Sequence, residues 1–150
     1  MQLEMDSVFD QLSWYGRGPC DTYWGRDKSG LVALHTVSVT QQDEHMRPQE
    51  HGNKQEVRWV TLTRSDGIGL KVYSIDEPIA ASARPYTLSD LHKATHVHEL
   101  PGAHAVTTLN IDAIQNGLGD CFVPCPERYK LQPKTEYTYR FEITPWKTQV

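Results

Sequence analysis

The chain has 150 residues, of which 38% are hydrophobic, and a formal net charge of -4. A chain of this length buries roughly 70% of its unfolded surface, which suffices for one core and not for two ordinary domains, so we expect one domain spanning residues 1–150. The acidic balance gives no electrostatic reason to expect a nucleic acid or an anionic membrane as partner, and no apolar run approaches the ~20 residues of a membrane span.

The first residues, MQLEMDSVFDQL, are acidic where a signal peptide is basic and then apolar. We therefore expect any export signal to lie upstream of this sequence, and the compartment stays open.

Strand signals dominate the chain. Stretches rich in Val, Thr, Leu or aromatic residues predict strands at 31–40, 55–64, 69–74, 79–84 and 103–112. Turn residues separate them at 27–30, 51–54, 65–67 and 101–102. Near the end, strict alternation predicts a half-buried antiparallel strand with one apolar face, made of Tyr137, Tyr139, Phe141 and Ile143.

One segment, residues 87–94, has a helical pattern. Thr87 can cap its start, Asp90 stands three residues on as a variant of the capping box, and Leu88 and Leu91 share a face. The sequence therefore predicts one helix of about two turns in an otherwise all-β chain.

Three cysteines, Cys20, Cys121 and Cys125, form an odd set, so any single disulfide leaves a free thiol and the disulfide state stays open. No second pair stands at the spacing of a structural zinc site, so we expect neither a metal nor another cofactor in this chain.

Four segments follow one another in a fixed order: WYGRGP at 14–19, RPQEHGN at 47–53, HVHELP at 96–101 and LNIDAIQNGLG at 109–119. Together they resemble the C-terminal end of a β-galactosidase of the large multidomain bacterial type, from about Ser7 to the end of the chain. The resemblance implies an all-β supersandwich, similar to galactose mutarotase, of which this chain is the C-terminal portion with one short helix.

The same resemblance implies a role. The first half of the supersandwich should precede this sequence, and the acid/base and nucleophile carboxylates should belong to a separate barrel domain. We expect a fragment that supplies packing and one wall of a galactoside site, with no hydrolysis on its own. A half-sandwich would leave strand edges and a sheet face unpaired, so we expect an oligomer or a complex with the remaining domains or large chain.

Glu50 is the best single candidate for a catalytic carboxylate, because Gly52 lets the backbone turn sharply and Arg47 could orient the carboxyl group. A neighbouring Arg lowers the pKa of a carboxyl group, which is the wrong direction for a general acid. We therefore interpret Arg47 and Glu50 as a hydrogen-bond network that holds the loop.

His96 and His98 lie beside Glu99, and on a strand the two imidazoles would point the same way, as metal ligands do. A third ligand at a fixed distance is not evident. By the resemblance they belong to a structural network, in which the imidazoles are bonded to neighbouring loops.

Sugars pack their apolar CH faces on aromatic rings and need polar partners for their hydroxyl groups. Trp14, Tyr15, Tyr23 and Trp24 flank a turn expected at 16–19 and could form such a site. The alternative interpretation places them in the core, at one end of a sandwich.

In similar β-galactosidases, the loop after the GxG motif carries a Trp or Cys that lines the active site of the neighbouring barrel. Here the GxG is Gly117 to Gly119, and Cys121 and Phe122 compete for that position because the loop is about two residues shorter than usual. The rival hypothesis is a stand-alone carbohydrate-binding or mutarotase-like module, which would need a His and a Glu converging in one cleft.

Overall fold

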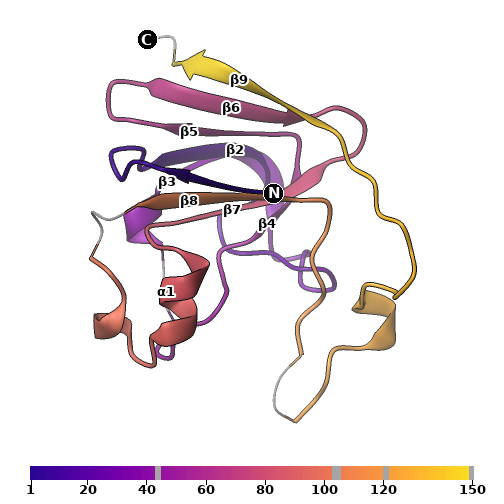
Figure 1. Cartoon of the computed structure of the whole chain (residues 1–150). Helices are drawn as coiled ribbons and strands as arrows, with labels where there is room; N and C mark the ends of the chain where they lie inside the picture. Colours follow the sequence, from indigo (N-terminus) through magenta and orange to yellow (C-terminus); the bar gives the residue numbers. More distant parts are fainter. Residues whose placement is uncertain (43–44, 103–105, 120–121, 149–150) are drawn as a thin grey trace.

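Two antiparallel sheets face each other in the computed structural model, which describes residues 1–42, 45–102, 106–119 and 122–148 (Figure 1). The four-stranded sheet has the order β1-β8-β7-β4, with bounds β1 Gln2–Met5, β8 Thr107–Asp112, β7 Ile79–Arg84 and β4 Lys54–Val57. The five-stranded sheet has the order β3-β2-β5-β6-β9, with bounds β3 Leu31–Ser38, β2 Gln11–Gly18, β5 Trp59–Thr63, β6 Ile68–Ser74 and β9 Phe141–Lys147. The prediction of an all-β fold is confirmed.

The core lies between the two sheets. It consists of apolar side chains at alternate positions of facing strands, which are Leu12, Trp14, Val60, Leu62, Val72, Ile79, Ala81, Ala83, Leu109 and Ile111. Each sheet thus covers the inner face of the other, because alternate side chains of every strand point to the same face. Within the described residues, the uncovered sheet face expected of a half-sandwich is not observed.

Helix α1, Leu88–Lys93, confirms the predicted helix. The Thr87 hydroxyl accepts a hydrogen bond from the Asp90 amide at 3.1 Å, and the Asp90 carboxylate accepts one from the Thr87 amide at 3.0 Å. This reciprocal pair satisfies donors that a helix start leaves open. The remaining helical turns are 3-10 turns, η1 Val39–Gln41, η2 Val97–Glu99 and η3 Glu127–Tyr129. None of the helices in the described part of the chain is long and apolar enough to cross a membrane.

The turn expected at 16–19 is wrong, because β2 continues to Gly18 and only then reaches Pro19. Glycine is required there by close packing and not by a turn. A Cβ atom on Gly16 would lie 2.9 Å from the Cα atom of Val57, so the backbones of β2 and β4 meet at this point. Glycine in a strand often marks such an approach of two backbones.

The strand expected at 55–64 divides into β4 and β5, which belong to different sheets. β4 pairs with β7, whereas β5 pairs with β2 and β6. The register of β4 shifts between Lys54 and Val57, and Glu56 adopts a φ of 51°. The bulge lets the chain pass from one sheet to the other within a few residues.

The strand expected from Tyr137 begins only at Phe141 and pairs with β6. Tyr139 and Phe141 pack on the core, in agreement with the predicted apolar face. Tyr137 and Ile143 are 42% and 41% exposed, so the two ends of that face lie outside the core.

Candidate functional site

The resemblance directs attention to the segment between β8 and β9, which leaves the sandwich as a long arm before it returns to the five-stranded sheet (Figure 1). The base of this arm is fixed by three contacts. The Gly117 amide donates to the Tyr129 carbonyl at 2.7 Å, the Leu131 amide donates to the Asn116 side chain at 2.6 Å, and the Tyr129 ring meets the Trp24 ring edge-on at 6.1 Å. The arm is therefore anchored on the turn that contains Trp24.

Gly117 is needed at this anchor. A Cβ atom there would lie 2.6 Å from both the Trp24 carbonyl oxygen and the Tyr129 Cβ atom. Beyond the anchor, Phe122 is 90% exposed and Val123 is 63% exposed. The arm thus holds two apolar side chains that are mostly exposed. Cys121, the other residue expected here, lies outside the described residues.

A recess of about 240 Å³ lies beside this anchor, and its lining includes the polar residues Asp27, Gln55 and Glu56 together with Trp24, Ile79 and Ile114. The Gln55 carboxamide clamps the turn, since its Nε2 donates to the Tyr23 carbonyl at 3.0 Å and its Oε1 accepts from the Trp24 amide at 3.1 Å. An indole beside carboxylate and amide groups is the combination that a sugar ring requires.

Arg17 connects the two carboxylates of this recess. Its Nε donates to Glu56 Oε1 at 2.6 Å, its Nη2 lies 3.9 Å from Asp27 Oδ2, and its Nη1 donates to the Gly30 carbonyl at 2.9 Å. The guanidinium thus ties β2 to the bulge of β4 and to the turn before β3, and its charge-assisted bonds give this end of the sandwich a defined shape. No local pattern in the sequence indicates Arg17, Asp27, Gln55 or Glu56, because these residues come from three different segments that meet only in the fold.

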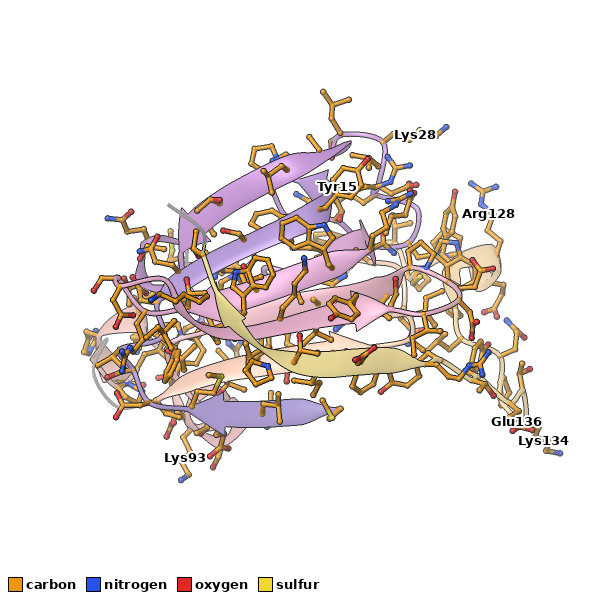
Figure 2. The ribbon with its side chains drawn as sticks, turned by 90° about the horizontal axis from the view of Figure 1, so that it is seen from above. Tyr15, Lys28, Lys93, Arg128, Lys134 and Glu136 are labelled. Carbon is orange, nitrogen blue, oxygen red and sulfur yellow. The ribbon has the colours of Figure 1, made fainter. Side chains whose placement is uncertain are left out.

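The four aromatic residues expected to flank one turn lie in three different environments. Trp14 is 1% exposed in the core, where its Nε1 donates to the Arg17 carbonyl at 2.9 Å. Tyr23 is also buried, and burial raises its pKa to about 12. Tyr15 lies on the outer face of the five-stranded sheet (Figure 2), and Trp24 alone borders the recess. The four side chains therefore do not form one sugar site.

Glu50 forms an ion pair with Arg84, a residue that lies far from it in the sequence. The Glu50 carboxylate is 3.5 Å from Arg84 Nη2, and Arg84 also donates to the His51 carbonyl at 2.9 Å. Arg84 is buried, whereas the Glu50 side chain is 58% exposed. The partner is thus a residue of β7, brought to the loop by the sheet. Glu50 as part of a loop network stays a prediction.

His96 caps the start of the turn η2 and His98 lies within it, so neither is on a strand, and their exposed rings stack at 5.4 Å between centres. His96 Nδ1 is 3.3 Å from Glu99 Oε1. The Thr95 backbone amide and hydroxyl, which donate to Glu99 Oε2, hold the pKa of Glu99 at about 2. Among the described residues, no group of three or more His, Cys, Asp or Glu side chains could hold a metal ion.

Comparison with known proteins extends these observations. A family model described as the β-galactosidase small chain matches residues 1–143. The β-galactosidase of Priestia megaterium is 36% identical over 149 residues, which cover 97% of this chain and 14% of that protein. The β-galactosidase of Halalkalibacterium halodurans is 31% identical over 147 residues, which cover 95% of this chain and 14% of that protein.

A shorter relative is the β-galactosidase small subunit of Latilactobacillus sakei, 32% identical over 137 residues, which cover 83% of this chain and 43% of that protein. The chain thus spans less than half the length of each of these three relatives. The family match extends over nearly all of the sandwich, from β1 into β9. The chain therefore belongs to the β-galactosidase small-chain family.

Proposed function

We propose that this chain is the C-terminal portion of the supersandwich of a multidomain β-galactosidase, and that it supplies packing and one wall of a galactoside site. The observation that carries the proposal is the arm after Gly117, which is anchored on Trp24 and Tyr129 and presents Phe122 at 90% exposure. A rigid base with an exposed apolar tip suits a loop that completes a site built mainly by another domain.

The carboxylates of the described residues support a non-catalytic role for the isolated chain. A retaining glycosidase needs two carboxyl groups roughly 5 Å apart, one of which has a raised pKa. Asp27 and Glu56 lie at one recess, and both are held by Arg17. Where the pKa of a described carboxyl group departs from its usual range, as at Asp66, Asp90 and Glu99, hydrogen bonds lower it. Hydrolysis of a β-galactoside would therefore fall to another domain or chain.

Two further surfaces support assembly with that domain or chain. The edge strand β3 exposes Leu31 and Leu34, which are 75% and 64% accessible. On the outer face of the same sheet, Lys71 Nζ lies 4.5 Å from the Trp59 ring centre and 4.4 Å from that of Trp146. Aromatic side chains with a cationic neighbour are enriched where proteins pack on each other.

A stand-alone mutarotase-like module would need its acid and base in one cleft. The His96 and Glu99 side chains do meet, but on an exposed turn, and neither of them lines the recess beside Trp24. With a pKa of about 2, Glu99 is ionised at neutral pH and has no proton to give to a sugar. The geometry thus favours the fragment over the module.

A chimera tests the proposal. In the β-galactosidase of Priestia megaterium, the segment that matches this chain is replaced by residues 1–150, and a second form lacks the segment altogether. We expect the chimera to hydrolyse an aryl β-galactoside, and both the shortened form and the isolated chain to be inactive. Turnover by the isolated chain that survives removal of contaminating enzyme, or a folded and inactive chimera, would refute the proposal.

A further inference from the structure

A second recess, of about 380 Å³, lies where the segment after β2, the turn η1 and the segment before β4 meet. Its polar walls include Asp21, Arg26, Gln42, His51 and Lys54. It shares no lining residue with the recess beside Trp24. We call it the Lys54 recess, and two of its lining residues, His51 and Gly52, belong to the RPQEHGN segment.

Lys54 carries the main charge of this recess. The residue is only 4% exposed. Its Nζ atom donates to the Pro19 carbonyl at 3.2 Å and lies 5.1 Å from the centre of the Trp14 ring. An ammonium group has three donors, and among the described residues only that one carbonyl accepts from it. Burial lowers the pKa of Lys54, and the nearby Asp21 carboxylate opposes this effect. The ammonium group is therefore buried without a carboxylate in direct contact.

Asp21 adds an acceptor. Its carboxylate group belongs to a residue that lines the recess, and its side chain is 19% exposed. A carboxylate has two oxygens that accept hydrogen bonds, so Asp21 can accept one from a ligand hydroxyl.

The recess keeps an excess of positive charge. Asp21 Oδ1 is 3.5 Å from Arg26 Nη2, so this one carboxylate faces the cations of both Arg26 and Lys54. Pro19 and Val37 supply apolar surface on the same recess. The walls thus offer a cation, a hydrogen-bond acceptor and an apolar patch, at a volume near the lower limit of ligand pockets.

We propose that the Lys54 recess binds a small hydroxylated carboxylate, of the class of uronic and aldonic acids. The ligand carboxylate contacts the Lys54 ammonium, and a ligand hydroxyl donates to the Asp21 carboxylate. Charge-assisted hydrogen bonds to a buried ammonium are stronger than neutral ones. The carboxylate should therefore make an acidic sugar bind more tightly than the corresponding neutral sugar. This inference does not depend on the proposed function, because it uses neither the arm nor any catalytic domain.

Titration calorimetry on the whole chain tests it with matched probes. Galacturonate and galactose differ only in that a carboxylate replaces the terminal hydroxymethyl group, and acetate carries the carboxylate alone. We expect galacturonate to bind with a Kd of about 1 mM or tighter, and galactose and acetate to bind at least about tenfold more weakly. Equal binding of galactose or of acetate, or no binding of galacturonate and gluconate, would overturn the inference.

A matched pair of variants locates the site. Lys54→Met should weaken galacturonate binding at least about tenfold, whereas Lys93→Met removes the same charge from α1 (Figure 2) and should leave binding unchanged. If both variants weakened binding equally, the effect would come from the net charge of the chain, and the assignment of the site to Lys54 would be wrong.

The unaltered chain gives a second measurement that does not require Lys54→Met to fold. Cys20 lines the recess, whereas Cys125 does not. Iodoacetamide labelling of Cys20, followed by peptide mass spectrometry, should slow as galacturonate saturates, while labelling of Cys125 stays constant. A Cys20 rate that is independent of galacturonate would place any binding elsewhere and contradict the assignment.

Discussion

Gly16→Ala tests a close approach between the two sheets. A Cβ atom at this position would lie 2.9 Å from Val57 Cα, 3.0 Å from the Glu56 carbonyl oxygen and 3.1 Å from the Gln55 carbonyl oxygen. All three atoms belong to the backbone of β4, so no side chain can move aside to relieve the contact. Ordinary carbon contacts are about 3.5 Å or longer, so β2 and β4 would have to separate by roughly 0.5 Å.

Overpacking of this kind costs about 1–3 kcal/mol, which in a chain of this size lowers Tm by roughly 2–12 °C. The matched control is Gly102→Ala, because a Cβ atom on Gly102 meets no described atom within 4 Å, and we expect it to stay within about 0.5 kcal/mol of the wild type. Urea unfolding followed by tryptophan fluorescence measures both variants. Equal midpoints for the two variants would refute the packing of β2 against β4.

Three further predictions concern individual side chains. Thr87→Ala should cost about 1 kcal/mol of unfolding free energy, whereas Thr87→Ser, which keeps the capping hydroxyl, should lie close to the wild type in the same assay. Glu50→Gln should change stability by about 1 kcal/mol or less because its side chain is 58% exposed, and a larger loss in urea unfolding would show that the Arg84 pair is more important than its exposure indicates. The pKa of Glu99 is lowered from 4.5 to about 2. The ionised carboxylate therefore stabilises the folded state fully above pH 4.5, and this stabilisation is lost as the pH falls towards 2. Glu99→Gln should remove this dependence from the NMR signal of the Thr95 amide, and an unchanged titration would contradict the hydrogen bonds at η2.

Sequence patterns identified those strands whose own residue types favour a sheet. β3, β6 and β7 lie close to their expected bounds, because each is rich in the β-branched, aromatic or small residues that suit a sheet. β2 was missed because Gly16 and Gly18 are typical of a turn, whereas the glycines are required by neighbours that are distant in sequence. The split of β4 from β5 was missed because a positive φ at Glu56 has no local signature.

The candidate site was predictable only where a single segment forms it. Phe122 is largely exposed, and its place in a wall of the galactoside site stays a prediction. The recess beside Trp24 depends on Arg17 and Glu56, which are 39 residues apart and meet only in the folded sandwich. The buried Lys54 gave no signal at all, because burial of a lysine is a property of the packing and not of its neighbours in the chain.

The most direct test of the central claim is the Michaelis constant of the Priestia megaterium chimera for an aryl β-galactoside. Replacement of Cys121 and Phe122 by Ala should raise KM roughly 3–10-fold with little change in kcat, because an aromatic contact that binds ground state and transition state equally contributes to KM alone. Val8→Ala, at an exposed position between β1 and β2, is the control and should leave both constants unchanged. Kinetic constants that do not respond to the Cys121 and Phe122 replacements would contradict the claim that this chain forms a wall of the galactoside site.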